Sequence, residues 1–158
     1  MPPEGTGLPV ESWRTRIMRW RFNRFPAYRR TGARITSIAA DLHTVTVRIP
    51  FDRRTRNYVG TMFGGVMYAA VDPVYAVMLI LLLGRGYQVW DKAASIRYRR
   101  PARTALEARF RLAGDELATI RRALEQQPRV DRRYGVELVG ADRTVYATVE
   151  KVVHVRRV

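Results

Sequence analysis

The chain lacks cysteine altogether and has only two histidines and two lysines among its 158 residues. Without cysteine it can form no disulfide, no thiolate metal ligand and no cysteine nucleophile. The histidines, His43 and His154, are far apart and show no HxxxH or HxxH spacing, so no metal site is expected. Disulfide-stapled secreted modules and enzymes with a cysteine nucleophile are thereby excluded.

Acidic residues are also few, since 14 Asp+Glu stand against 29 Lys+Arg and leave a formal net charge of +15. Such an excess favours an anionic partner: a phosphate group, a nucleic acid or an anionic lipid surface. No nucleic-acid-binding motif is found, so a nucleic-acid partner is not expected. Hydrophobic residues make up 47% of the chain, which at this length predicts one domain with its own core.

The N-terminal region differs in composition from the rest of the chain. Its first ten residues are rich in proline and glycine and lack the apolar core of a secretory signal, so we expect a cytoplasmic protein. Residues 1–28 are expected to form an arm and a basic amphipathic helix, and residues 29–158 a single domain. The helix is expected over Glu11–Phe25, with Ser12 as its N-cap and Pro26 at its end.

The apolar residues of this helix, Trp13, Ile17 and Trp20, are spaced so that they share one face. Arginines occupy most of the remaining positions. Two interpretations stay open. The helix could lie on an anionic membrane surface through residues 11–25, or it could pack across the domain with its arginines in solvent.

The longest apolar run is Val66–Leu83, interrupted only by Asp72 and Pro73 and ended by Gly84. Its length approaches that of a membrane span. An acidic residue near its middle, a proline beside it and strand patterns on both sides favour a different structure. They predict a long helix buried in the core and bent at Pro73.

Segments of alternating apolar and polar residues lie on both sides of this run, the clearest being Thr44–Pro50. Two strands are expected before the helix, and four strands with one short helix among them after it. This order predicts an α+β fold in which one curled antiparallel sheet wraps around the long helix. The expected strands are 34–41, 44–50, 87–99, 105–112, 132–139 and 143–155, with the short helix at 114–127.

Asp72 is the residue most suited to chemistry, because a carboxylate in so apolar a run must be paired, hydrogen-bonded or functional. It could cap the second half of the bent helix ahead of Pro73, or it could be a catalytic or ligand-binding carboxylate. Gly64 and Gly65 open the helix, where unpaired N–H groups can receive a carbonyl or a phosphate. Gly65 and Asp72 lie roughly 10 Å apart along the helix, so one carbonyl can meet both only if a second subunit supplies one of them.

The segment from Asn57 to Asp72 resembles the active-site segment of hot-dog-fold acyl-CoA thioesterases of the phenylacetyl-CoA type. In that family an Asn precedes a loop, His-Gly-Gly opens the central helix, and an Asp follows the second Gly by seven positions. Here Asn57, Gly64, Gly65 and Asp72 stand at these places. The Phe-Gly-Gly and Asp-Pro features are most similar to a bacterial branch described as a domain of unknown function (DUF4442). The resemblance covers roughly residues 34–155 and implies a hot-dog fold.

The resemblance also implies an acyl-CoA thioesterase that is a homodimer, or a dimer of two such dimers, with composite sites at the subunit interface. The Gly65 N–H would polarise the thioester carbonyl, Asp72 from the other chain would act as nucleophile or as base for water, and Asn57 would position water or substrate. No cofactor is implied, since coenzyme A enters only as part of the substrate.

Further substrate contacts are expected from Phe63, Gly64 and Tyr75. Phe63 stands where the family has His, and Tyr75 carries the only hydroxyl soon after Asp72, so binding of acyl ligands without cleavage is the alternative function. A basic membrane-surface protein is the third. The phosphates of coenzyme A are expected on a cluster of arginines near the end of one strand: Arg97, Arg99, Arg100 and Arg103.

Overall fold

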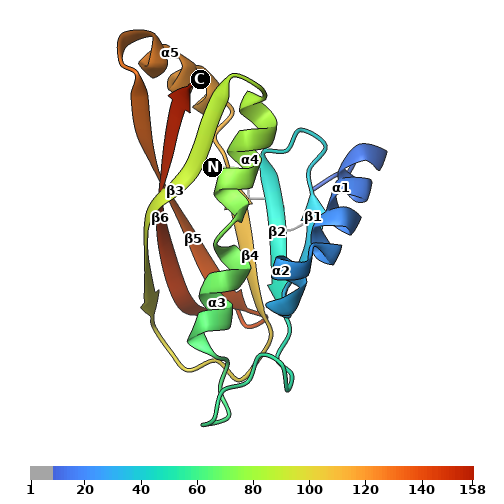
Figure 1. Cartoon of the computed structure of the whole chain (residues 1–158). Coiled ribbons are helices and arrows are strands. Elements are labelled where there is room, and N and C mark those ends of the chain that lie inside the picture. Colours follow the sequence, from blue (N-terminus) through green and yellow to red (C-terminus); the bar gives the residue numbers. More distant parts are fainter. Residues whose placement is uncertain (1–8) are drawn as a thin grey trace.

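The computed structural model of the chain describes residues 9–158 and shows one curled sheet wrapped around a central helical segment (Figure 1). The six strands are antiparallel throughout and follow the order β1-β2-β4-β5-β6-β3. The expected α+β architecture is therefore confirmed, while most of the expected arm lies outside the described residues. The strands are β1 (Arg34–Ile38), β2 (Thr44–Ile49), β3 (Tyr87–Tyr98), β4 (Leu106–Arg111), β5 (Arg129–Gly140) and β6 (Val145–Arg157), and the helices are α1 (Trp13–Arg24), α2 (Pro26–Arg30), α3 (Gly64–Val71), α4 (Val74–Leu83) and α5 (Glu116–Gln126).

The central segment consists of α3 and α4, which meet at Asp72 and Pro73. Pro73 has no N–H to continue the helical hydrogen bonds, so the ladder breaks where the sequence predicts a bend. Both residues keep helical dihedral angles, and α3 and α4 therefore run on as one interrupted rod. By length and composition alone Gly64–Leu83 could cross a membrane. An 18-residue window within it has a mean hydropathy of 2.1, and half of that window is buried inside the domain.

The sheet opens between β4 and β5, which pair only over residues 106–108 of β4. Tyr75 of α4 fills the opening: its ring stacks on that of Tyr134 at 4.7 Å and meets Phe110 edge-on at 5.0 Å. Its hydroxyl donates a hydrogen bond to the carbonyl of Gly135 at 2.7 Å. Tyr75 is thus part of the hydrophobic core, where it joins the central helix to the sheet.

Helix α1 packs against the sheet, as one of the two open interpretations expects, but the apolar stripe is not the face that packs. Met18 and Phe22 contact the hydrophobic core. The helix ends at Arg24, one residue before the expected end, and Pro26 begins the short helix α2, which was not expected. The predicted apolar stripe instead faces solvent, with exposed fractions of 68%, 50% and 56% for Trp13, Ile17 and Trp20.

Polar side chains near the two ends of α1 fix its orientation by bonding to the edge of β1. Asn23 exchanges two hydrogen bonds of 2.8 Å with the backbone of Ile35, and Glu11 accepts the N–H of Ile38 at 2.9 Å. Ser12 caps the helix, as expected. These bonds decide which face of α1 meets the sheet, because an unpaired strand N–H or carbonyl is costly to leave without a partner.

The two edges of the sheet consequently differ. The edge of β1 is partly covered by side chains of the α1 region, whereas the outer side of β3 pairs with no strand in residues 9–158. β3 is twelve residues long, and its middle, residues 92–95, is exposed. A long unpaired edge strand is a surface on which another strand can pair.

Candidate functional site

A buried lysine lies beside the bend between α3 and α4. Lys151 of β6 is 1% exposed, and its ammonium lies 2.6 Å from Asp72 Oδ1 and 3.1 Å from Asp91 Oδ2. The ammonium is also 5.4 Å from the ring centroid of Tyr68. Burial alone would lower the pKa of Lys151, but the two carboxylates outweigh it and hold this pKa above its usual value of 10.5. Lys151 is therefore a buried cation that joins the central helix to β3.

Asp72 is held by one oxygen and open at the other. Its Oδ1 accepts hydrogen bonds from Lys151 at 2.6 Å and from the hydroxyl of Tyr68 at 2.7 Å. No hydrogen bond to Oδ2 is found within residues 9–158, and the side chain is 43% exposed. The capping alternative is wrong, because no side chain in the described part of the chain caps α4. A fixed carboxylate with one free oxygen can act as a nucleophile or a base.

Asp91 lies on the other side of Lys151, where the register of β3 against β6 shifts. Its Oδ1 is buried and has no hydrogen-bond partner among residues 9–158. Burial raises the pKa of Asp91, and the hydrogen bond and charge of Lys151 oppose that rise. The site thus holds two carboxylates around one buried cation, and removal of that cation leaves both without a countercharge.

Sequence reasoning missed Lys151, Asp91 and Tyr68, although the chain carries a signal for each. Alternate residues of β6 face the core, and Lys151 occupies such a position between the buried Val149 and Val153. Asp91 likewise follows partly buried residues at alternate positions of β3. Tyr68 precedes the predicted site carboxylate by four residues on one helix, a spacing that brings two side chains together. For Lys151 and Asp91, the signal in the sequence is a charged residue at a strand position whose neighbours two residues away are apolar.

A first cavity, of about 500 Å³, opens at the N-terminus of α3. No side chain in residues 9–158 caps this helix, so its first N–H groups lack the partners that a cap would supply. The structure brings most of the predicted site residues together here. Those that line the cavity are Asn57, Phe63, Gly64, Gly65, Arg99 and Arg100.

Two aromatic rings lie against the glycines at the start of α3. A Cβ atom at Gly64 would come within 2.8 Å of the Tyr98 ring, and one at Gly65 within 2.6 Å of the Phe63 ring. Both rings are more than half exposed. The absence of side chains at the glycines therefore lets the rings close over the helix start and form an apolar wall of the cavity.

Asn57 closes the turn that leads into this cavity. Its side chain accepts the N–H of Thr61 at 2.9 Å and donates to the Thr61 hydroxyl at 2.8 Å. The role expected of Asn57 toward substrate stays a prediction. The remaining predicted residues lie elsewhere: Tyr75 is in the core, while Arg97 and Arg103 are exposed and do not line the cavity.

A second cavity, a groove of about 860 Å³, runs between α1–α2 and α3–α4, and Asp72 lies in its wall. The groove shares no lining residue with the first cavity. Within one chain, Asp72 and Gly65 therefore face different spaces. This agrees with their separation along the helix, which predicts that one protomer cannot bring both to a single carbonyl.

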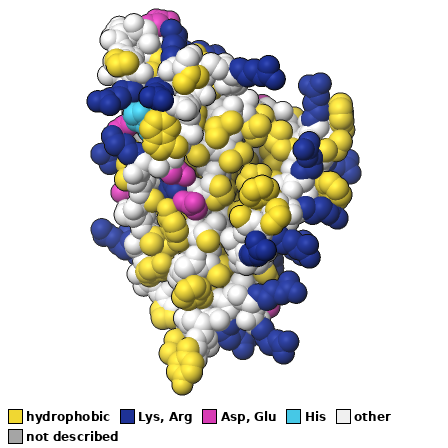
Figure 2. Space-filling view, viewed as in Figure 1, with side chains coloured by type: hydrophobic (Ala, Val, Ile, Leu, Met, Phe, Trp, Pro, Cys, Tyr) yellow, Lys and Arg dark blue, Asp and Glu magenta, His cyan; other side chains and the backbone are white. Residues whose placement is uncertain are grey.

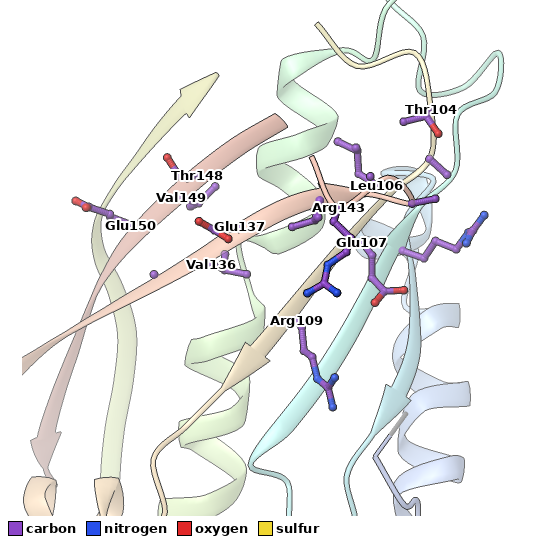
Figure 3. Close-up of a pocket in the computed structure, with 16 residues that line it drawn as sticks. Thr104, Leu106, Glu107, Arg109, Val136, Glu137, Arg143, Thr148, Val149 and Glu150 are labelled. Carbon is purple, nitrogen blue, oxygen red and sulfur yellow. The ribbon is translucent and has the colours of Figure 1, made fainter. Parts of the chain in front are cut away.

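A third cavity, of about 850 Å³, lies over β4, β5 and β6 (Figure 3). Glu107 and Arg109 in its lining alternate along β4 with buried residues, so this cavity is on the face of the sheet away from the core. None of the predicted site residues lines it. In residues 9–158 no group of three or more His, Asp or Glu is placed to hold a metal ion.

The curled antiparallel sheet around a central helix is the hot-dog fold. The chain belongs to the family described as a domain of unknown function (DUF4442), whose family model matches residues 14–154. That match covers α1 except for its first residue, the first five strands in full, and β6 up to its last three residues. Among curated proteins no significant match is found.

Solved structures of low sequence identity share the fold over nearly the whole chain. A Pseudomonas aeruginosa protein of unknown function, PA5026, described as a probable thioesterase, superposes with a TM-score of 0.80 at 18% identity, covering 96% of this chain and 99% of that one. Thioesterase HI1161 from Haemophilus influenzae gives a TM-score of 0.68 at 15% identity, with 96% of each chain covered. A mutant form of thioesterase PA1618 from Pseudomonas aeruginosa gives 0.68 at 14% identity, covering 90% of this chain and 94% of that one.

Proposed function

We propose that the protein hydrolyses acyl thioesters, with acyl-CoA as the substrate class, and that Asp72 carries the reaction. The observation behind this proposal is the state of the Asp72 carboxylate. Its Oδ1 is anchored by Lys151 and Tyr68, while its Oδ2 is open and the side chain lines a cavity. The thioesterase descriptions of the structures that share the fold support the same reaction class.

In the proposed reaction, Asp72 Oδ2 takes a proton from a water molecule and the resulting hydroxide adds to the thioester carbonyl carbon. The carbonyl oxygen becomes an oxyanion, which the N–H of Gly65 receives. The C–S bond then breaks, the proton passes from Asp72 to the leaving sulfur, and the products are a carboxylic acid and the thiol of coenzyme A. Direct attack by Oδ2, through a mixed anhydride that water opens, gives the same products.

The proposed site needs two copies of the chain, because Gly65 and Asp72 of one copy face different cavities. The open edge of β3 is where the copies would pair. When two β3 strands pair antiparallel about their middle, the end of one strand lies near the start of the other. Tyr98, in the first cavity of one protomer, is thereby brought toward the Asp91 region of the second. A homodimer of this kind is part of the proposal.

Coenzyme A fits the same arrangement through its phosphates. Arg99 and Arg100 lie at the end of β3 and line the cavity that contains Gly65. A guanidinium group can donate two parallel hydrogen bonds to the oxygens of one phosphate. The nucleotide end of coenzyme A would therefore bind at Arg99 and Arg100. Phe63 and Gly64 would contact the part of the substrate next to the thioester.

The proposed function is tested by measuring thiol release from acetyl-, butanoyl-, octanoyl-, dodecanoyl- and phenylacetyl-CoA with a thiol-reactive dye. The protein has no cysteine, so every thiol detected comes from coenzyme A. We expect release above the uncatalysed rate from at least one of these substrates and a dimeric molar mass by light scattering. Binding of acyl-CoA without any release would contradict hydrolysis and support the non-catalytic alternative.

A second candidate function is attachment to an anionic membrane surface, which the exposed stripe on α1 favours. Trp13 and Trp20 are exposed, and arginine guanidinium groups lie 5.5 Å and 4.0 Å from their ring centroids. We expect the protein to float with vesicles that contain anionic lipid, and the Trp13→Ala/Trp20→Ala protein to float several-fold less, because tryptophan favours the interface. Flotation that is the same for both proteins, or the same on neutral vesicles, would contradict this role.

A further inference from the structure

The groove between the helices is built from two facing helix surfaces. On the central segment its lining follows the spacing Ala69, Pro73, Val77 and Leu81, which is one face of a continuous helix. On the N-terminal side it is lined by one face of α1 and by parts of α2. Figure 2 shows hydrophobic side chains gathered over α3–α4 and toward α1, with basic side chains along the α1 side. The lining residues of α1 are Arg14, Ile17, Met18, Arg21 and Phe22.

The groove explains why several large apolar side chains are left uncovered. Ile17, Phe25 and Leu81 are 50%, 61% and 42% exposed, and all three line the groove. A smaller void of about 20 Å³ lies alongside it and is enclosed entirely by apolar residues, several of which the two spaces share. A concave space of this volume with a mostly apolar lining is typical of a small-molecule site.

Among residues 9–158, Asp72 is the only acidic residue in the lining of this groove. In the proposed reaction the thioester carbonyl must lie at Asp72 Oδ2, so the acyl chain has to leave from that point. The groove offers it an apolar route along α4. From Asp72 to Leu81 the helix rises by about 13 Å, which accommodates an extended chain of medium length.

We propose that this groove binds the acyl chain of the substrate, and that the protein therefore prefers medium- to long-chain linear acyl-CoA over short-chain acyl-CoA. This inference rests on the proposed function for the position of the carbonyl. The chain lies between α1 and α4, with its far end beside Leu81. Arg14 and Arg21 stay at the sides of the groove, where their charges can remain in water while their stems cover the chain.

The inference is tested by a substitution that fills the far end of the groove with a larger side chain. Leu81→Trp places a larger ring in the groove, whereas Ile80→Trp puts the same ring on the neighbouring exposed position, which does not line it. We expect Leu81→Trp to lower the ratio of kcat/KM for dodecanoyl-CoA to that for butanoyl-CoA at least tenfold. Ile80→Trp should keep this ratio within twofold of that of the unmodified protein. An unchanged ratio in Leu81→Trp would overturn the inference.

A binding measurement separates this inference from the proposed function. Dodecyl-CoA and butyl-CoA are thioethers that cannot be hydrolysed, and calorimetry measures their affinities for the full chain. We expect dodecyl-CoA to bind at least tenfold more tightly, with this preference lost in Leu81→Trp and kept in Ile80→Trp. If this result is found in a protein that releases no thiol, it supports acyl-chain binding in the groove and contradicts hydrolysis. Equal affinities for the two thioethers in the unmodified protein would contradict acyl-chain binding in the groove, whether or not the protein releases thiol.

Discussion

Replacement of Lys151 by methionine is expected to lower the free energy of unfolding by about 2–3 kcal/mol. Loss of one member of a buried ion pair commonly costs about 3–5 kcal/mol, and the partial exposure of Asp72 screens part of that cost. For a chain of this length the expected fall in midpoint temperature is about 4–12 °C. Methionine retains the apolar stem of lysine, so the loss comes from the missing charge rather than from a cavity. Calorimetry of the two proteins measures it.

The second lysine of the chain supplies the control. Lys92 lies on β3, bonds to Asp131 at 2.6 Å, and has a side chain that is 55% exposed. Exposed ion pairs contribute little, so Lys92→Met is expected to change the free energy of unfolding by less than about 0.5 kcal/mol. Equal losses from the two substitutions would contradict a special role for the buried lysine.

The loss caused by Lys151→Met should depend on pH. Burial already raises the pKa of Asp91 in the native protein, and without Lys151 nothing opposes that rise. A carboxyl whose pKa is raised on folding favours the folded state when protonated, and this gain is lost as pH increases through the folded-state pKa. The variant is therefore expected to approach the stability of the unmodified protein as pH falls toward 3.8, the usual carboxyl value. At the alkaline end the contribution of Lys151 is lost as well, as pH rises through its own pKa, which is raised above 10.5.

Much of the fold follows from local patterns in the sequence. The alternation of residues such as Val45 and Val47 defines strands, and the position of Pro73 defines the break between α3 and α4. Helical rise alone separates Gly65 from Asp72, and the structure places them in different cavities. Periodicity and backbone chemistry determine these features, and both can be read from a short stretch of chain.

Features that depend on distant contacts could not be predicted in the same way. The apolar spacing of α1 places Trp13 and Trp20 on one face but does not decide whether that face meets the domain or a membrane surface. The bonds from Asn23 and Glu11 to β1 turn another face to the sheet. Local sequence also allows Asp72 to cap a helix. Its observed partner, Lys151, comes from the last strand of the sheet. Asp72 therefore binds Lys151 rather than capping α4, and this choice depends on a contact that forms only when the sheet packs around the helix.

Asp72→Asn is the substitution with the largest expected effect on activity. Asparagine has nearly the same shape and can still accept hydrogen bonds from Tyr68 and Lys151 through its Oδ1. It cannot take a proton from water or attack a thioester, and loss of a general base typically costs 10²- to 10⁴-fold in rate. We expect kcat/KM for the best acyl-CoA substrate to fall at least 100-fold, since the carboxylate is the reacting group.

Asp91→Asn is the matched control variant. Asp91 pairs with the same lysine as Asp72, but its side chain does not line the groove. Its activity is expected to fall less than tenfold. Circular dichroism and thermal melting establish that each variant is folded.

The decisive measurement is the rate of thiol release by the unmodified protein and by folded Asp72→Asn, side by side on the same acyl-CoA. Release that disappears with the Asp72 carboxylate is the predicted result, and equal release by the two proteins would contradict the proposed role of Asp72.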